Sequence, residues 1–205
     1  MIPQVFCPGF PRCGTTFIAK VLNQHPEIHI PMRTHHIYDY PVKNEIHYFN
    51  KMPTRKIFNR KESDEGFNKN MSEYVKHFKE GKTNLDFSIC TAYDRNAAKR
   101  VKDCLGDVKI LFFVRNVKDH QESLKILIKE VKKEYSYFQL FIDDYDKLFS
   151  RVKVVDLEEI EKNQQHTFVT ILNFLGVKNT AFPFNFKVHK HSTEDIRNAR
   201  AKNLS

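Results

Sequence analysis

The residues best suited to chemistry lie near the start of the chain, where Gly9 and Gly14 have the spacing of a G-x-x-x-x-G loop. An apolar run over residues 3–8 predicts a strand before this loop, and the apolar spacing over 15–24, stopped by Pro26, predicts a helix after it. Such a loop directs backbone N–H groups and a helix N-terminus at one point, which makes a site for an anion such as phosphate. The alternative is an ordinary glycine turn between a strand and a helix.

The loop departs from the pattern of nucleotide triphosphatases, because Thr15 stands where those proteins need lysine. Arg12 is the cation inside the loop. Cys13 beside it has two interpretations: a thiol whose thiolate the site could stabilise, or a small residue that fits a tight turn. The loop therefore predicts a phosphate site that uses arginine.

A second polar group follows the most apolar strand that the sequence predicts, residues 108–114. Arg115 leaves the carboxyl end of that strand, and Ser123 follows on the next predicted helix. A guanidinium fork and a hydroxyl both suit phosphate oxygens. Arg115 alone would fit a surface ion pair equally well, but its occurrence together with the first loop indicates a second anion site.

Strands and helices alternate along the chain. Strands are predicted at 3–8, 84–89, 108–114 and 151–155, and helices at 15–24, 70–80, 94–104, 118–133, 136–149 and 160–175, the last ended by Gly176. This order predicts one α/β domain over 1–205, with a three-layer, P-loop-like architecture in which helices flank a central parallel sheet. Ligands of such sheets bind at the carboxyl ends of the strands. Residues 31–69 form a long loop that we expect to be functional, and 187–205 form a basic tail.

Composition limits the partners and the location. The 205 residues carry a net charge of +9, with a pI of about 9.3, which favours anionic partners such as a nucleotide or an acidic glycan. The lysines are spread along the chain, so nucleic acid is not an expected partner. No apolar run approaches the roughly 20 residues of a membrane span, and the N-terminus has no signal-peptide pattern. Together with four widely spaced cysteines, this predicts a cytoplasmic protein; a trimmed Golgi luminal domain is the alternative.

Taken together, these motifs resemble the sulfotransferases that use 3′-phosphoadenosine-5′-phosphosulfate (PAPS). Residues 12–16 match their 5′-phosphosulfate loop, [KR]-x-G-T-[TR]. Arg115, Asn116 and Ser123 match their 3′-phosphate motif, R-[DN]-P-x-x-[RD]-x-x-S, with Val117 in place of proline. The resemblance implies PAPS as the sulfuryl donor, 3′,5′-adenosine bisphosphate (PAP) as the product, and no required metal. It also implies a set of cofactor-binding residues: Arg12, Cys13, Gly14, Thr15, Thr16, Arg115 and Ser123.

A third match concerns the catalytic base. Residues 43–50 are similar to the K-x-E-[IV]-[HQ]-[FY]-F segment of heparan sulfate and related glycan sulfotransferases, in which the glutamate is the general base. The resemblance implies that Glu45 takes a proton from a carbohydrate hydroxyl or amine. Lys43 and His47 flank Glu45 at alternating strand spacing, and His47 is a rival base. Without the resemblance, Glu45 would fit an exposed carboxylate at a strand edge.

Other acceptors and other functions stay open at this point. The tyrosylprotein sulfotransferases share the arginine in the loop, so a tyrosine or small-molecule acceptor is an alternative. In the expected in-line displacement, Arg12 would stabilise charge on the departing phosphate. The rival functions are a P-loop-type kinase for a small molecule or nucleotide and a non-catalytic anion- or glycan-binding module. The strand over 108–114 ends in arginine where a kinase would need aspartate. His25 and His29 are four residues apart, but Pro26 stops the predicted helix there, so they do not form the helical H-x-x-x-H pattern of a metal site. The histidines that could suggest such a site are His25, His29, His35, His36 and His47.

Overall fold

A parallel five-stranded sheet is the centre of the computed structural model, which describes residues 1–31, 46, 48–49, 70–125 and 136–187. The strands lie in the order β2-β3-β1-β4-β5, and each neighbouring pair runs parallel. Their bounds are Val5–Cys7 (β1), Ile28–His29 (β2), Thr83–Phe87 (β3), Lys109–Val114 (β4) and Val152–Asp156 (β5). The predicted α/β class with a central parallel sheet is confirmed.

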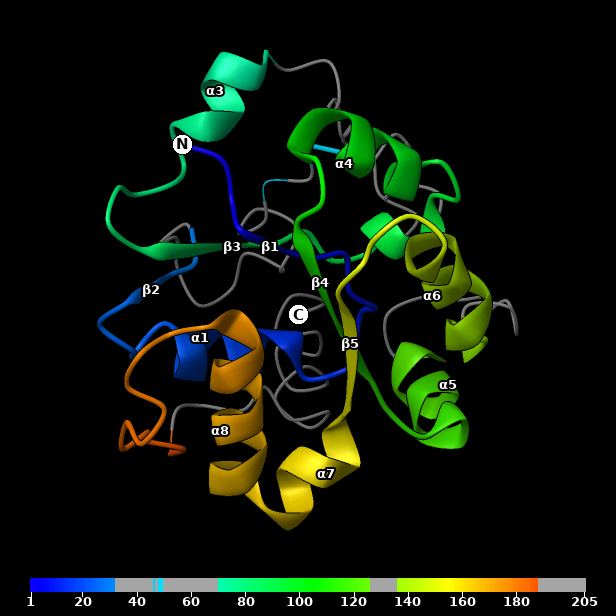
Figure 1. Ribbon diagram of the computed structural model, residues 1–205. Coiled ribbons are helices and arrows are strands. Elements are labelled where there is room, and N and C mark those ends of the chain that lie inside the picture. The colour runs from blue at the N-terminus through cyan, green and yellow to red at the C-terminus, as the bar shows by residue number, and fades with distance from the viewer. Residues whose placement is uncertain (32–45, 47, 50–69, 126–135, 188–205) are drawn as a thin grey trace, which may run out of the picture.

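Helices cover both faces of this sheet. Figure 1 shows α1 and α8 on one side of it and α4 and α6 on the other. The helices are α1 (Thr15–Leu22), α3 (Met71–Val75), α4 (Ala97–Leu105), α5 (Val117–Lys125), α6 (Phe138–Asp146), α7 (Leu157–Lys162) and α8 (Gln164–Leu175), with a 3-10 helix, η3, at Thr91–Tyr93. Parallel strands need crossover connections, which helices supply. The predicted three layers follow from this arrangement.

Strand β4 has the burial of a central strand. Its four residues from Ile110 to Phe113 have no exposed surface, and β4 lies between β1 and β5. A strand covered on both faces needs apolar residues at every position, because both sets of side chains leave water. This explains why the continuous apolar run in the sequence was sufficient to locate it.

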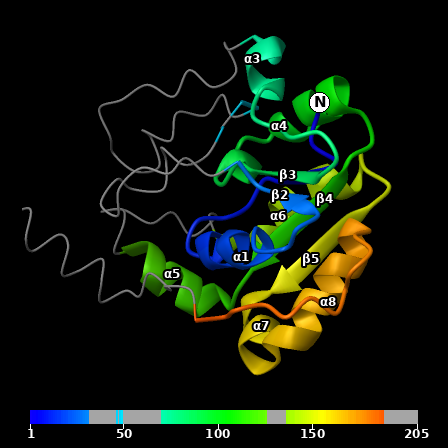
Figure 2. The same cartoon turned by 90° about the vertical axis from the view of Figure 1, so that its left-hand side faces the viewer.

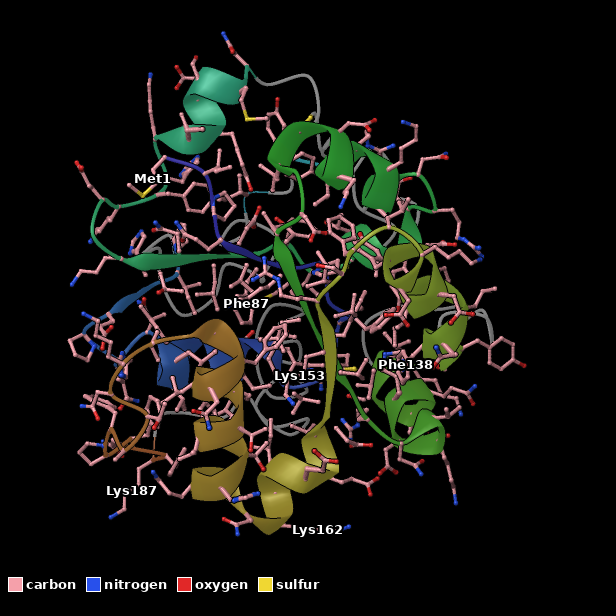
Figure 3. The ribbon with its side chains drawn as sticks, in the orientation of Figure 1. Met1, Phe87, Phe138, Lys153, Lys162 and Lys187 are labelled. Atoms are coloured by element: carbon pink, nitrogen blue, oxygen red, sulfur yellow. The ribbon has the colours of Figure 1, made fainter. Side chains whose placement is uncertain are left out.

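An aromatic cluster fixes the start of the glycine loop. The ring of Phe10 lies 4.7 Å from that of Phe138, 5.7 Å from Phe112, 5.6 Å from Tyr93 and 6.1 Å from Phe141, measured between centroids. Figure 3 shows Phe138 between α5 and α6. Such pairs contribute about 0.5–1.5 kcal/mol each beyond the burial of their area. The loop is thereby attached to the helices on the α6 side of the sheet.

One predicted helix is divided in the structure, and one strand of the sheet was not predicted. The single helix expected over 160–175 is two helices, because Asn163 has φ −149° and ψ 80° and its side chain accepts from the backbone N–H of His166 at 3.2 Å. Asparagine is a preferred N-cap, so it starts α8 and does not continue α7. Strand β2 has two residues, too few for an alternating pattern to reveal. Gly176 ends α8 with φ 81°, as expected.

The carboxyl ends of β1 and β4 place the two phosphate motifs at one edge. Strand β1 leads into residues 8–14 and α1, and its neighbour β4 leads into residues 115–116 and α5. Figure 2 shows α5 beside α1 at this edge. Segments separated by a hundred positions in the sequence therefore meet here.

Candidate active site

The glycine loop has alternating backbone handedness. Arg12 has φ 70° and Gly14 has φ 72°, whereas Cys13 between them does not have positive φ. Among the described residues, the non-glycine residues with positive φ are Arg12 and Cys90. Alternation of this kind turns successive N–H groups toward one point and forms an anion-binding concavity. A left-handed conformation costs a non-glycine residue on the order of 1–3 kcal/mol, so the loop needs contacts that hold it.

Side chains of the second motif supply those contacts. The Nη1 of Arg115 donates to the carbonyl oxygen of Arg12 at 3.2 Å, and Nε2 of His120 lies 2.9 Å from the carbonyl oxygen of Pro11. Two consecutive carbonyls of the loop are thus bound by residues that follow β4. The shape of the first motif depends on the second.

The backbone conformation of Gly14 favours glycine, and the side chain of Leu157 lies against it. A Cβ atom at this position would lie 2.7 Å from Cδ1 of Leu157, at the start of α7. The φ of 72° also disfavours any L side chain. The element that follows β5 therefore forms one wall of the loop.

Helix α1 begins directly behind the loop. Its first intrahelical bond runs from the N–H of Ile18 to the carbonyl of Gly14 at 3.1 Å, so the N–H groups of Thr15 and Thr16 precede it. Gly14 offers no side-chain cap, and the first turn carries no acidic residue. A helix start of this composition favours a bound anion.

The two cationic side chains and the serine lie together. Nε of Arg12 donates to Oγ of Ser123 at 2.7 Å, and Ser123 is buried. Asn116, which matches the same motif, accepts from the backbone N–H of Lys118 at 2.9 Å and so caps α5. The structure thus brings Arg12, Arg115 and Ser123 to the start of α1. A weaker ion pair also joins Arg115 to Asp119 at 3.9 Å.

Cys13 is a packed residue of the loop. Its side chain has no exposed surface. Burial raises the pKa of its thiol well above the ordinary value, and the nearby guanidinium groups of Arg115 and Arg12 only partly oppose this. Burial and the raised pKa favour the interpretation of Cys13 as a small residue in a tight turn over that of a thiolate site.

His120 was not singled out by the sequence. It has no exposed surface; its Nδ1 lies 2.8 Å from Oγ of Ser136, and its ring centroid lies 4.7 Å from that of Phe138. Burial, opposed by the Pro11 carbonyl and assisted by the neighbouring arginines, lowers its pKa to about 4. It occupies a position of the 3′-phosphate motif where family members carry arginine or aspartate, and that departure was the available signal.

A buried carboxyl lies on the other side of β1. Asp86 in β3 has no exposed surface; its Oδ2 accepts from the hydroxyl of Tyr74 at 2.8 Å, and its Oδ1 accepts from Oγ of Ser88 at 2.6 Å. Burial raises its pKa to about 6, while the two hydrogen bonds oppose the rise. Residues 86–93 lie where glycan sulfotransferases carry a K-[ST]-P-x-Y-like segment, but the lysine and proline are missing, which puts a substrate role for this segment in doubt.

The predicted base lies outside the described residues, as do Lys43 and His47, but the segment that follows Glu45 has a described anchor. The ring of Tyr48 packs on that of Tyr74 at 4.7 Å, and the ring of Phe49 meets that of Phe6 of β1 at 5.5 Å. Arg100 donates twice to the carbonyl of Phe49, at 3.0 and 2.7 Å. The chain next to the predicted base is thus fixed to β1 and α3.

Two further observations bear on metals and membranes. In the described ranges, His, Cys, Asp and Glu side chains form no group of three that could hold a metal ion. A helix long and apolar enough to cross a membrane is likewise missing from the part of the chain that the structure describes. The expectations of a metal-independent reaction and of a cytoplasmic location stay predictions.

Comparisons with known proteins agree with this geometry. The sequence profile described as "Sulfotransferase family" matches residues 3–181. A crystal structure of a sulfotransferase from Alicyclobacillus acidocaldarius is 21% identical, with a TM-score of 0.66, and the match covers 100% of this chain and 92% of that one.

A mouse sulfotransferase, SULT7A1 complexed with PAP, is 14% identical with a TM-score of 0.47 over 98% of this chain and 64% of its own. No curated protein sequence matches the chain. The profile spans most of the chain, and the bacterial structure shares its fold. The chain therefore belongs to the sulfotransferase family, and sulfotransferase, not kinase, is the enzyme class that its sequence and fold support.

Proposed function

We propose that this protein transfers the sulfuryl group of PAPS to a hydroxyl or amine of a carbohydrate acceptor. The observation that carries the proposal is the contact of the two phosphate motifs: Arg12 donates to Ser123, and Arg115 donates to the carbonyl of Arg12, directly before the start of α1. A donor with phosphates at both the 5′ and 3′ positions needs two anion sites in one place. Membership of the family implies a nucleotide cosubstrate of this kind.

The residues of the loop suit the 5′ end of the donor. The alternating backbone of residues 12–14 suits an anion bound against backbone N–H groups, with Leu157 as a wall behind Gly14. We assign the N–H groups of residues 13–16 and the hydroxyls of Thr15 and Thr16 to the 5′-phosphate, and Arg115 and Ser123 to the 3′-phosphate. PAPS supplies the sulfuryl group and, in PAP, a leaving group that these cations and hydroxyls hold.

Arg12 has a different role in this assignment. Its guanidinium stays charged at all working pH values, so it acts by electrostatics and hydrogen bonds and does not donate a proton. The hydrogen bond to Ser123 orients it at the loop. We assign it to the charge that develops on the departing phosphate.

The assignment of residues to the acceptor is supported by the sequence match and by one structural observation. We assign Glu45 as the base that removes the acceptor proton, with His47 as its rival and Lys43 as a group that binds the sulfuryl oxygens or an acidic acceptor. The anchoring of Tyr48 and Phe49 beside β1 supports a place for this segment near the phosphate loop. A tyrosine or a small molecule is the alternative acceptor.

Calorimetric titration tests the donor site. Wild type, Arg115→Ala and Arg95→Ala are each titrated with PAP and with magnesium-ATP. Arg95 pairs with Asp144 and is half exposed, so its removal is a matched loss of one arginine elsewhere. We expect metal-independent, micromolar binding of PAP that Arg115→Ala abolishes and Arg95→Ala retains. Tighter binding of magnesium-ATP, without a response to PAP, would move the protein to the kinase function.

Incubation with PAPS and a panel of acceptors then separates catalysis from binding. Transfer to glycans with release of PAP supports the proposal, and loss of transfer in Glu45→Gln with donor binding retained supports the base. Affinity for PAPS without any release of PAP would indicate a non-catalytic binding module. Transfer to tyrosine peptides or small phenols alone would replace the carbohydrate acceptor.

A further inference from the structure

The imidazole of His120 joins three segments around the phosphate loop. Its Nε2 lies 2.9 Å from the carbonyl oxygen of Pro11, its Nδ1 lies 2.8 Å from Oγ of Ser136, and its ring meets the edge of the Phe138 ring. A carbonyl oxygen can only accept, so Nε2 carries the proton and Nδ1 accepts from the Ser136 hydroxyl. Both ring nitrogens are thus used, and the loop, α5 and the start of α6 are tied together.

The place where His120 attaches to the loop is the peptide before Arg12. The carbonyls of Pro11 and Arg12 are bound by His120 and Arg115, and Arg12 between them is left-handed. A non-glycine residue keeps such a conformation only when its surroundings impose it. With the two carbonyls held by side chains that follow β4, the following N–H groups are left to face the anion site.

We propose that His120 is a positioning residue for sulfuryl transfer, which holds the Pro11–Arg12 peptide so that Arg12 keeps its left-handed backbone and its contact with Ser123. The inference rests on the proposed function, because it concerns the same loop. His120 touches neither phosphate nor acceptor in this role. It acts through Arg12, so its loss should affect the rate of transfer more than the affinity for the product.

A second buried histidine provides a matched control. His25 is also almost fully buried; its Nε2 lies 2.8 Å from the carbonyl of Asn179, its Nδ1 accepts from the N–H of Glu27, and its ring meets that of Phe182. It therefore makes the same kinds of contact as His120, but beyond the far end of α1. A purely structural role for His120 predicts that equivalent substitutions at the two positions behave alike.

The test uses His120→Phe, His120→Gln, His25→Phe and Ser136→Ala. Phenylalanine keeps the ring packing and removes both hydrogen bonds, whereas the glutamine amide can restore the donor to Pro11. Each variant is measured for its urea midpoint, kcat, KM for PAPS and PAP affinity. We expect His120→Phe to lower kcat about 100-fold, the order of loss that a misplaced catalytic group causes, with PAP affinity reduced far less.

His120→Gln should recover most of the lost rate, and His25→Phe should lose stability with kcat unchanged. If His120→Phe does not fold, His120→Gln and Ser136→Ala carry the test, with an expected loss in kcat larger than the loss in PAP affinity. An active wild type whose His120 variants keep kcat, or lose only what their unfolded fraction explains, overturns this inference alone. A wild type that neither binds PAP nor transfers sulfuryl overturns the proposed function instead.

Discussion

Two buried polar clusters lie on opposite sides of β1, and they use burial in opposite ways. The loop cluster consists of the Pro11 carbonyl, His120 and Ser136, and the strand cluster consists of Tyr74, Asp86 and Ser88. Burial keeps the base in the first cluster neutral, with a pKa of about 4, and favours the neutral form of the acid in the second, with a pKa of about 6.

The partners of the two clusters also differ. His120 binds the backbone of the phosphate loop, so the loop cluster controls the shape of the donor site. Asp86 accepts from the side chains of Tyr74 and Ser88, and the ring of Tyr74 packs on that of Tyr48. The strand cluster therefore adjoins the segment to which the proposed function assigns the acceptor. The difference teaches that the proposed donor and acceptor sides can be perturbed separately, although both adjoin one short strand.

The largest effect is expected on the donor side, from Arg12→Ala. Loss of a preorganised cation at a developing charge costs about 100- to 1,000-fold in rate, so kcat should fall by this amount while the strand cluster is untouched. Initial rates of transfer from PAPS measure it. Arg12→Lys should retain much of the rate, and an equal loss in Arg95→Ala would contradict the assignment.

The pH dependence of stability separates the two clusters directly. The folded state holds the proton of Asp86 more tightly than the unfolded chain does (about 6 against 3.8), so this group contributes stability that is present below about pH 4 and lost as pH rises through 6. His120 releases its proton on folding (about 4 against 6.5), so its contribution is lost as pH falls from 6.5 to 4. Each of these two contributions to the free energy of unfolding amounts to about 3 kcal/mol.

In wild type, the contribution of Asp86 to the free energy of unfolding falls with pH between about pH 4 and 6, while that of His120 rises, so the two offset one another. We expect Asp86→Asn to show unfolding free energy that rises with pH over this window, and His120→Gln to show one that falls. Urea unfolding at a series of pH values measures both. Parallel curves for the two variants would show that the clusters do not titrate as described.

Gly14→Ala tests the wall of the donor site, with Gly81→Ala as its control. Both glycines have nearly the same φ, 72° and 70°, but a Cβ at Gly14 meets Leu157 at 2.7 Å whereas one at Gly81 meets nothing within 4 Å. Gly81→Ala should cost about 1 kcal/mol from backbone conformation alone. Gly14→Ala should cost about 1–2 kcal/mol more and weaken PAP binding. Equal losses would show that Leu157 is not a wall.

Tyr74→Phe in the strand cluster is expected to affect stability alone, by an amount that depends on pH. At about pH 8 it removes one hydrogen bond to an ionised carboxylate and should cost about 1.5–3 kcal/mol, less at low pH, where Asp86 is protonated. Tyr145→Phe is the matched control, because the Tyr145 hydroxyl is buried without a hydrogen-bond partner among the described residues. That change should be neutral or slightly stabilising in urea unfolding. A similar loss in both variants would mean that ring packing, not Asp86, explains the result.

The sequence was informative where the pattern is local. The apolar run of β4 and the glycine spacing before α1 need no distant partner to be recognised, so the sheet and the glycine loop could be predicted. The contacts of His120 and Asp86 could not, because they involve atoms of Pro11 and Tyr74 that only the folded chain brings near. The same holds for the break at Asn163. The roles of Lys43, Glu45 and His47 stay predictions.

The contact of Gly14 with Leu157 has a consequence for how the protein is made. The phosphate loop precedes its wall in α7 and its partner Ser123 in α5 along the chain. A nascent chain that stops before β5 has the loop sequence without the loop shape. A nucleotide bound as proposed can therefore stabilise only a chain that already includes α5 and α7, since a ligand stabilises the state that binds it. During synthesis, such a nucleotide cannot assist folding until β4 and β5, which precede these two helices, have been added.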